Sequence, residues 1–266
     1  MELHLAGKTA IVTGGSAGIG LACAEALFAE GVNVVIAARN EPRLTFAAQQ
    51  IRQFMPLGAD PTVMVVAADM NVPEDIARVV ETAVGNYGRI DILVNCAGAA
   101  VAGPFLDLPD EAFTSAWNLK LLGYIRMVRA VLPQMIAQGD GRIVNIVGGA
   151  GRTPSPAFLT GSTANAALLN FTRGVSKELA RHGIRINAIS PGATATERNE
   201  WLAEQNAAAR GISVAEYQAE AVRAIPLGQL VDPAEIAAMT LLLVSDRVRS
   251  ITGTEVVIDG GQMPGV

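Results

Sequence analysis

The chain changes from a strand pattern to a helix pattern at Thr13-Gly14-Gly15-Ser16-Ala17-Gly18-Ile19-Gly20. The run Thr9–Thr13 leads into this turn, and a helical pattern follows it. A dinucleotide pyrophosphate must approach the backbone closely at a helix N-terminus, where amide groups and the helix dipole favour anions. Glycines leave room for that approach. Because the cluster lies between a strand and a helix, it predicts a dinucleotide-binding turn rather than an ordinary tight connection.

Further short apolar runs alternate with longer helical patterns along the chain. They are Val32–Ala37, Val63–Ala67, Ile92–Asn95, Ile143–Val147, Ile184–Ile189 and Glu255–Ile258. Near-continuous apolar runs suit strands buried on both faces of a parallel sheet. We therefore predict a single Rossmann-type domain over residues 1–266, a doubly wound α/β fold with a seven-stranded parallel sheet and helices on both faces.

One long segment does not follow the alternation of strand and helix patterns. Residues Glu197 to Leu227 form a long insertion between two strand patterns, rich in Ala and Glu and carrying Trp201. Insertions at the carboxyl ends of strands carry substrate contacts in folds of this type. The sequence predicts helices over 197–227 that act as a substrate lid.

Composition excludes several classes of protein. The net charge of −5 and the pI of about 5.1 argue against a nucleic-acid partner. The longest apolar stretches, such as Ile236 to Val244, are too short to cross a bilayer. The chain begins without a basic segment followed by an apolar one, and its two cysteines and two histidines are scattered. We expect a cytoplasmic protein with no membrane partner, no metal and no disulfide framework.

The end of the second predicted strand bears on the choice of cofactor. It reads Ala37-Ala38-Arg39-Asn40, without the acidic residue that would bind the ribose 2′-hydroxyl of NAD. Arg39 is suited to pair with the 2′-phosphate of NADP. The pattern favours NADP(H) over NAD(H), and the alternative is a solvated surface arginine.

With these motifs the sequence resembles the short-chain dehydrogenase/reductase family, from about Gly7 to Gly261. Asn95-Cys96-Ala97-Gly98, Pro191-Gly192 with Thr196, and Asp259-Gly260-Gly261 are similar to motifs of that family, as is the turn at 13–20. The resemblance implies cofactor contacts from residues in and beside them. These are Gly14, Ser16, Ala17, Gly18, Ile19, Gly20, Asp69, Met70, Asn95, Ala97, Gly98, Asn165, Pro191, Gly192, Thr194 and Thr196.

The positions that match the family's catalytic tetrad of Asn, Ser, Tyr and Lys hold other residues. Lys120 stands where the Asn is expected, and Gly148 replaces the Ser. Gly161 replaces the Tyr, and Asn165 replaces the Lys. The resemblance therefore implies an atypical member of the family that lacks the tetrad.

Lys120 stands at the family's Asn position and Asn165 at its Lys position, so the two residue types look exchanged rather than lost. The hypothesis is that Lys120 supplies the missing cation and also donates a proton, while Asn165 hydrogen-bonds the cofactor ribose. The alternative is that Lys120 is a solvated helix residue. Gly148 and Gly161 together predict a wider pocket.

Structural roles are expected for four further residues near these positions. Ser162 and Thr163 suit a helix N-cap, Arg152 suits the surface, and Tyr124 suits the core or a subunit interface.

We expect an NADP(H)-binding oxidoreductase that moves a hydride between its cofactor and a carbonyl or alcohol substrate. The alternative is a non-catalytic NADP(H)-binding sensor or scaffold. A lyase or dehalogenase ranks last, because relatives of that kind keep Ser and Tyr and lose the nucleotide loop. The substrate is a small molecule of unknown class. The resemblance also implies a homo-oligomer, a tetramer or dimer, joined through the helices around Lys120–Met135 and Thr163–Ala180 and the C-terminal strand.

Overall fold

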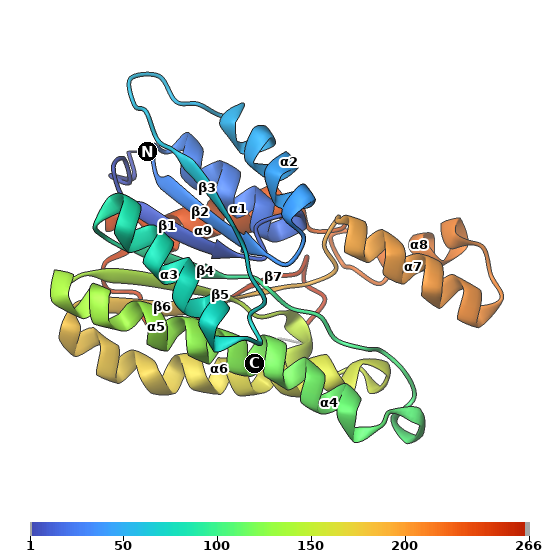
Figure 1. The fold of residues 1–266 in the computed structure, drawn as a ribbon. Coiled ribbons are helices and arrows are strands. Elements are labelled where there is room, and N and C mark those ends of the chain that lie inside the picture. The colour runs from blue at the N-terminus through green and yellow to red at the C-terminus, as the bar shows by residue number, and fades with distance from the viewer. Residues whose placement is uncertain (1, 264–266) are drawn as a thin grey trace.

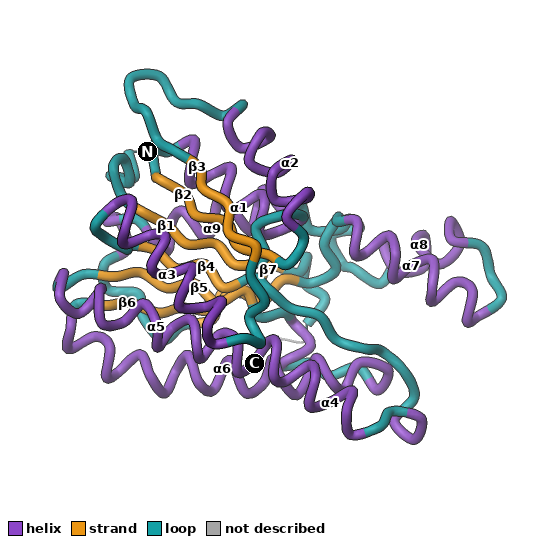
Figure 2. Tube along the Cα trace, viewed as in Figure 1, coloured by secondary structure: helices purple, strands orange, loops and turns teal. Residues whose placement is uncertain are grey.

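The computed structural model describes residues 2–263, and its centre is a seven-stranded parallel sheet (Figures 1 and 2). The strands lie in the order β3-β2-β1-β4-β5-β6-β7, as in doubly wound folds. Their bounds are β1 Thr9–Thr13, β2 Asn33–Ala38, β3 Val63–Ala67, β4 Ile92–Asn95, β5 Gly141–Ile146, β6 Ile184–Pro191 and β7 Glu255–Ile258. The predicted fold class is confirmed, and every strand overlaps the apolar run that predicted it.

Helices cover both faces of the sheet and divide the core into two main layers (Figure 1). On one face lie α1 (Gly18–Ala29), α2 (Glu41–Arg52) and α9 (Pro233–Val244). On the other lie α3 (Pro73–Tyr87), α5 (Gly123–Gln138) and α6 (Leu159–Leu179). No described helix combines the length and the apolar character that spanning a bilayer requires.

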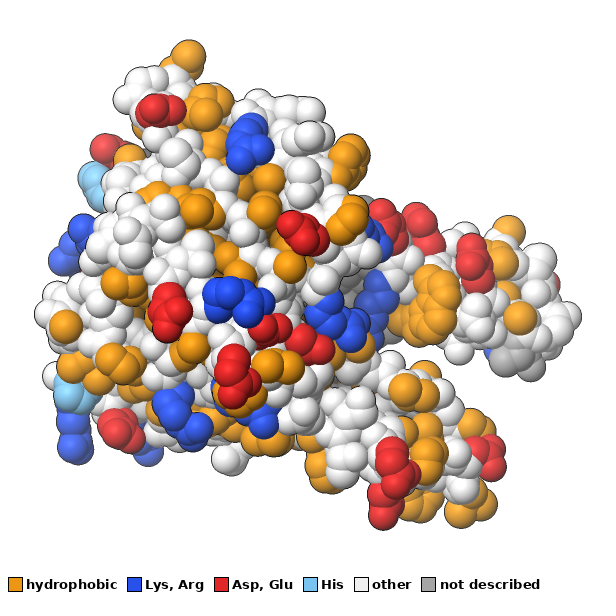
Figure 3. Space-filling view, viewed as in Figure 1, with side chains coloured by type: hydrophobic (Ala, Val, Ile, Leu, Met, Phe, Trp, Pro, Cys, Tyr) orange, Lys and Arg blue, Asp and Glu red, His pale blue; other side chains and the backbone are white. Residues whose placement is uncertain are grey.

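Two parts of the chain project from this body. The helices α7 (Glu197–Arg210) and α8 (Val214–Arg223) form a two-helix arm, coloured orange in Figure 1. The second part contains α4 (Asp110–Ala116) and the short turn Phe105–Asp107 before it. Hydrophobic side chains are exposed on both, as Figure 3 shows; Trp201 lies on the arm and Leu106 beside α4. The helices predicted over 197–227 are present, and their role as a lid stays a prediction.

The predicted N-cap at Ser162 and Thr163 is wrong. The helix α6 begins three residues earlier, at Leu159. The Ser162 hydroxyl donates to the Phe158 carbonyl at 2.8 Å, and that of Thr163 donates to the Leu159 carbonyl at 2.9 Å. Both hydroxyls therefore satisfy carbonyl groups one turn back inside the helix, instead of capping free amide groups at its start.

A buried polar chain joins the centre of the sheet to α6. The Asn95 amide donates to Asn145 Oδ1 at 3.0 Å, and the Asn145 amide donates to the Thr172 hydroxyl at 2.9 Å. Asn95 and Asn145 are fully buried, and Thr172 nearly so. Because buried polar groups are costly when unpaired, Asn145 links β4, β5 and α6.

Asn145→Ala should lower the free energy of unfolding by about 2–3 kcal/mol, because it leaves the partner groups of Asn95 and Thr172 unpaired. Urea denaturation followed by circular dichroism measures the change. The control is Asn86→Ala on α3, whose exposed amide donates only to the Thr82 carbonyl and should change stability by less than about 0.5 kcal/mol. Equal effects of the two substitutions would contradict a structural role for the network.

Candidate functional site

The predicted motifs meet at the carboxyl edge of the sheet, because parallel strands end on the same side. The turn after β1 is tied to its neighbours there. The Gly14 N–H donates to the Ala37 carbonyl of β2 at 2.8 Å. The Thr13 hydroxyl accepts from the main-chain amides of Cys96 and Ala97, at 3.1 and 3.3 Å. The ends of β1, β2 and β4 are therefore held as one unit.

The glycine turn fits a phosphate. Gly14 and Gly18 have φ angles of +71° and +54°, a region that side chains disfavour. A Cβ on Gly20 would overlap the Gly14 carbonyl oxygen, and a Cβ on Gly14 would lie 2.9 Å from the Ala97 nitrogen. Ala17, the N-cap of α1, offers no side-chain acceptor to the first amide groups of that helix. Those groups remain available to an anion.

A cavity of about 560 Å³ opens beside this turn, at the ends of β4, β5 and β6. Most of the predicted nicotinamide-side residues line it. They are Ile19, Gly98, Lys120, Gly148, Gly161, Asn165, Pro191, Gly192, Thr194 and Thr196. Its volume is within the range of small-molecule sites in proteins. The structure thus brings Lys120, Gly148, Gly161 and Asn165 into one cavity.

The remaining predicted residues lie outside this cavity. They are Gly14, Ser16, Ala17, Gly18, Gly20, Arg39, Asp69, Met70, Asn95 and Ala97. Arg39 is exposed just after β2, and Asp69 follows β3 and accepts from the main-chain amide of Asn71 at 2.9 Å. Met70 and Asn95 are buried.

Lys120 lies on a π-helical segment, Trp117–Leu122, between α4 and α5. Such segments are frequent at functional sites. The indole of Trp117 donates to the Thr163 hydroxyl at 2.8 Å, which fastens the segment to α6. Asn118 faces elsewhere, since its side chain bonds Asn71 and Arg126. Lys120 is therefore the side chain that this segment presents to the cavity.

The Lys120 ammonium is held at the end of β5. Its Nζ donates to the Val147 carbonyl at 2.6 Å, and its stem crosses Gly98, where a Cβ would lie 3.2 Å from Lys120 Cδ. The pKa of Lys120 is lowered from 10.5 to about 8, mainly by desolvation and also by the nearby charge of Arg198, while Cys96 opposes the shift. A lysine with this pKa exchanges protons near neutral pH.

Asn165 occupies the place beside Gly148. Its amide donates to the Gly148 carbonyl at 3.4 Å, and its Oδ1 is buried with no hydrogen-bond partner among the described residues. Gly148 has a φ of +118°, and a Cβ there would lie 3.0 Å from Asn165 Nδ2. A buried acceptor without a donor is costly, so the Oδ1 is suited to receive a ligand hydroxyl.

The expectation that Gly161 widens the pocket is wrong. A Cβ on Gly161 would overlap the ring of Phe158, which fills the space above it. The sequence gives a weak signal for this packing, because Phe158 precedes Gly161 by one helical turn. The space beside Gly161 is thus taken by an apolar ring.

Other candidates lie outside the cavity. Tyr124 is buried in the core, with its hydroxyl donating to the Ile146 carbonyl at 3.0 Å. Arg152 is paired with the buried carboxylate of Glu255 at 2.6 Å, so it is not a free surface arginine. None of the three tyrosines lines this cavity, and residues 2–263 hold no cluster of metal-ligating side chains.

The base of the two-helix arm is tied across the site by contacts that sequence reasoning missed. Arg198 donates to the Gly98 carbonyl at 2.7 Å and lines the cavity. Glu197 forms an ion pair with Arg43 of α2. These residues carry no motif, and only the path of the arm brings them to the cleft.

The fold and the glycine turn define a dinucleotide-binding protein of the doubly wound α/β class. The family model "short chain dehydrogenase" matches residues 8–207. Oxidoreductase UcpA of Escherichia coli (strain K12) is 35% identical over 258 residues, covering 97% of this chain and 95% of its own. The chain belongs to the short-chain dehydrogenase family.

Two solved structures are also similar. L-sorbose reductase from Gluconobacter frateurii, complexed with NADPH and L-sorbose, has a TM-score of 0.93 at 30% identity, with all of both chains covered. An NAD⁺-bound xylitol dehydrogenase has a TM-score of 0.90 at 28% identity, covering 97% of this chain and all of its own. The fold is shared by relatives with either cofactor.

Gly20→Ala should destabilise the turn, because its methyl group would overlap the main chain of Gly14. We expect a loss of more than about 2 kcal/mol in the free energy of unfolding, as for overpacking against backbone. The matched control is Gly85→Ala in α3, where the added methyl meets open space and should be neutral or stabilising by about 0.5–1 kcal/mol. Similar stability of the two variants would contradict the proposed tight turn.

Proposed function

We propose that this protein is an NADP(H)-dependent oxidoreductase in which Lys120 serves as the proton donor and acceptor for a carbonyl or alcohol substrate. The observation that carries the proposal is the half-buried Lys120 side chain, whose ammonium lies in the cleft with a pKa lowered to about 8. The NADPH and L-sorbose named for a similar structure support this reaction class. The substrate of this chain is a small molecule of unknown class.

The cofactor would be held by groups at the carboxyl edge of the sheet. The amides of the turn at 14–20 would hold the pyrophosphate, and Arg39 the 2′-phosphate. The unpartnered Oδ1 of Asn165 would accept from a ribose hydroxyl, and residues 191–196 would contact the nicotinamide side. When bound, the nicotinamide supplies or takes the hydride at the substrate carbon.

Lys120 would complete the proton side of the reaction. An ammonium has three donors, and the Val147 carbonyl accepts one of them. The remaining two are suited to hold a substrate oxygen and to give it a proton as it gains negative charge. In the opposite direction the free amine takes that proton. General acid–base catalysis contributes roughly 10²–10⁴-fold.

A non-catalytic NADP(H)-binding sensor is the second candidate. It is favoured by the absence of a tyrosine from the cavity lining and by the main-chain hydrogen bonds that occupy Lys120 and Arg198. Titration of NADPH and NADH by fluorescence, followed by a screen of carbonyl substrates for NADPH oxidation, separates the two. NADPH binding without turnover across the screen would favour the sensor.

A homo-oligomer is also part of the proposal. The faces and edge implied by the family resemblance carry apolar side chains that are partly exposed in the single chain. They include Ile136 on α5, 42% exposed, and Val257 on β7, 39% exposed. Burial of such groups would stabilise a dimer or tetramer.

Lys120→Met should lower kcat for carbonyl reduction by roughly 10²–10⁴-fold while leaving NADPH bound. It should also raise the free energy of unfolding at pH 7 by about 2 kcal/mol. Removing the buried charge gains about 3 kcal/mol from the lowered pKa, and the lost hydrogen bond costs about 1 kcal/mol. Lys177→Met, at an exposed site on α6, is the control and should change neither quantity. Unchanged turnover in Lys120→Met would exclude the proposed role.

The pH dependence of kcat should report the protonation state of Lys120. Because the pKa of Lys120 is lowered to about 8, the ammonium is the main form at pH 7. Reduction uses that form, so its kcat should fall as pH rises through about 8. Oxidation uses the free amine, so its kcat should rise over the same range. Steady-state kinetics in both directions measures the two profiles, and parallel profiles would contradict the assignment.

Arg39→Gln should weaken NADPH binding by at least about tenfold, the effect of losing a charge-assisted hydrogen bond to phosphate, and should leave NADH binding unchanged. Fluorescence titration of both nucleotides measures the ratio. The control is Arg129→Gln, at an exposed position on α5 that does not line the cleft. A wild-type preference for NADH, or equal weakening of both nucleotides, would overturn the role of Arg39.

A further inference from the structure

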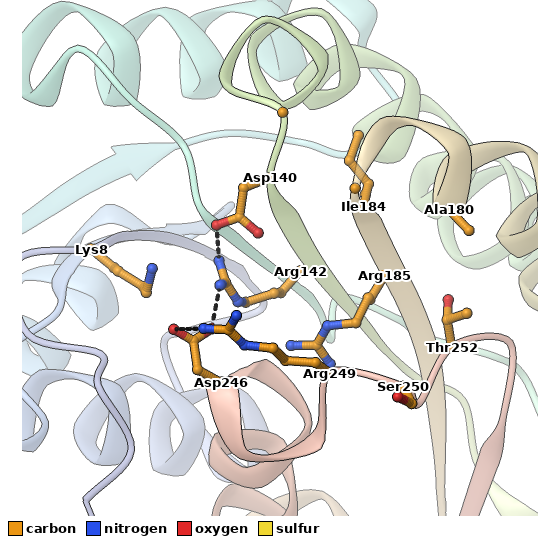
Figure 4. A pocket seen from close by; sticks show the side chains of 12 residues that line it. Lys8, Asp140, Arg142, Ala180, Ile184, Arg185, Asp246, Arg249, Ser250 and Thr252 are labelled. Carbon is orange, nitrogen blue, oxygen red and sulfur yellow. Dashed lines mark hydrogen bonds and ion pairs between the residues drawn. The ribbon is translucent and has the colours of Figure 1, made fainter.

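A second cavity lies at the opposite, amino-terminal edge of the sheet (Figure 4). Its volume is about 450 Å³. Its walls come from the residue before β1, the starts of β5 and β6, and the segment after α9. The lining includes four cationic side chains and two carboxylates: Lys8, Arg142, Arg185, Arg249, Asp140 and Asp246. The cofactor cleft at the carboxyl edge shares none of its lining residues.

The two carboxylates are already bound to arginines. Arg142 Nη1 donates to Asp140 at 2.5 Å, and its Nη2 donates to Asp246 at 2.7 Å. The second oxygen of Asp246 lies 3.2 Å from Arg249 Nη2. Four cations facing two carboxylates leave a formal charge of +2 on the wall of the cavity. No further carboxylate among the lining residues balances this charge.

Several cationic donors face this space without an acid of their own. Lys8 is half-buried, and no carboxylate in residues 2–263 forms an ion pair with its ammonium group. Arg185 is bound only to main-chain carbonyls, those of Leu243, Val248 and Ser245. Arg142 is 5% exposed, and its Nε is buried without a hydrogen-bond partner. Figure 4 shows these groups around one hollow.

The positive charges of the arginines also repel one another. Burial lowers the pKa of Arg185, and the nearby charges of Arg142 and Arg249 contribute to the shift, which Asp140 and Asp246 offset in part. Clustered like charges at the rim of a low-dielectric interior repel. The carbonyls at and after the carboxyl end of α9 compensate Arg185 in part, whereas Lys8 has neither a carboxylate nor a carbonyl partner among the described contacts. The remaining positive charge around Lys8 and Arg249 is suited to a mobile anion.

We propose that this cavity is a second ligand site, which binds the dianionic phosphate group of a small phosphorylated molecule. A phosphate monoester carries a charge of about −1.5 to −2 at neutral pH, which matches the charge of the wall. Guanidinium groups match the geometry of phosphate oxygens, and ammonium groups attract them as point charges. The hydroxyls of Ser250 and Thr252 add polar groups to the lining. The volume leaves room for a small organic part beside the phosphate.

Isothermal titration calorimetry with inorganic pyrophosphate tests the site, in a chloride buffer of matched ionic strength. The test variant is Lys8→Gln/Arg249→Gln, because both positions lie outside the buried Arg142 pair and should leave the fold intact. We expect it to weaken pyrophosphate binding by at least about tenfold. Circular dichroism and the thermal midpoint confirm that the variant is folded.

The turn at 14–20 would also hold pyrophosphate, so the wild type should show two binding events and the double variant only one. Arg39→Gln, beside the cofactor cleft, is the matched control. It should leave the strength of pyrophosphate binding at the second site within about twofold of wild type. The proposal is overturned by two binding events that survive in the double variant, by loss of the second-site event in Arg39→Gln alone, or by only one event in the wild type.

Discussion

The close approach of the Gly14 and Gly20 main chains is the constraint on which the rest of the cleft depends. A Cβ on Gly20 has no room beside the Gly14 carbonyl, so β1 passes directly into α1. Thr13, one residue before, holds the amides of Cys96 and Ala97. Gly98, which follows Ala97, leaves room for the aliphatic part of the Lys120 side chain. The Lys120 ammonium then reaches the Val147 carbonyl. A continuous series of short contacts thus joins the phosphate turn to the cationic group.

The Lys120 cation and the Asn165 amide reach the cleft from different helices. The cation arises on the π-helical segment before α5, while α6 contributes the neutral amide of Asn165. Both side chains end near the carboxyl end of β5, where they bond the carbonyls of Val147 and Gly148. Partial burial makes the Lys120 charge costly to the folded protein and chemically responsive at the same time. That combination is typical of groups that act on a ligand.

The sequence predicted the sheet well because buried parallel strands are near-continuous apolar runs, and all seven runs overlap strands. It also placed Lys120, Gly148, Gly161 and Asn165 in one cavity, because motif spacing sets the strand ends and the helices beside them. The sequence could not predict how side chains from distant segments pack together. The Phe158 ring over Gly161 and the reach of Arg198 to Gly98 depend on the paths of a loop and of the arm. Local patterns do not encode those paths.

The ring of Phe158 above Gly161 limits which side chains this wall of the cleft can accept. Any side chain introduced at 161 would meet that ring, so the residue at 158 would have to become smaller first. A serine at 148 would have to adopt a φ of +118° or force the loop to rearrange. A side chain at either position is therefore opposed by a neighbour or by the backbone. New functional groups on this wall of the cleft would need paired substitutions rather than single ones.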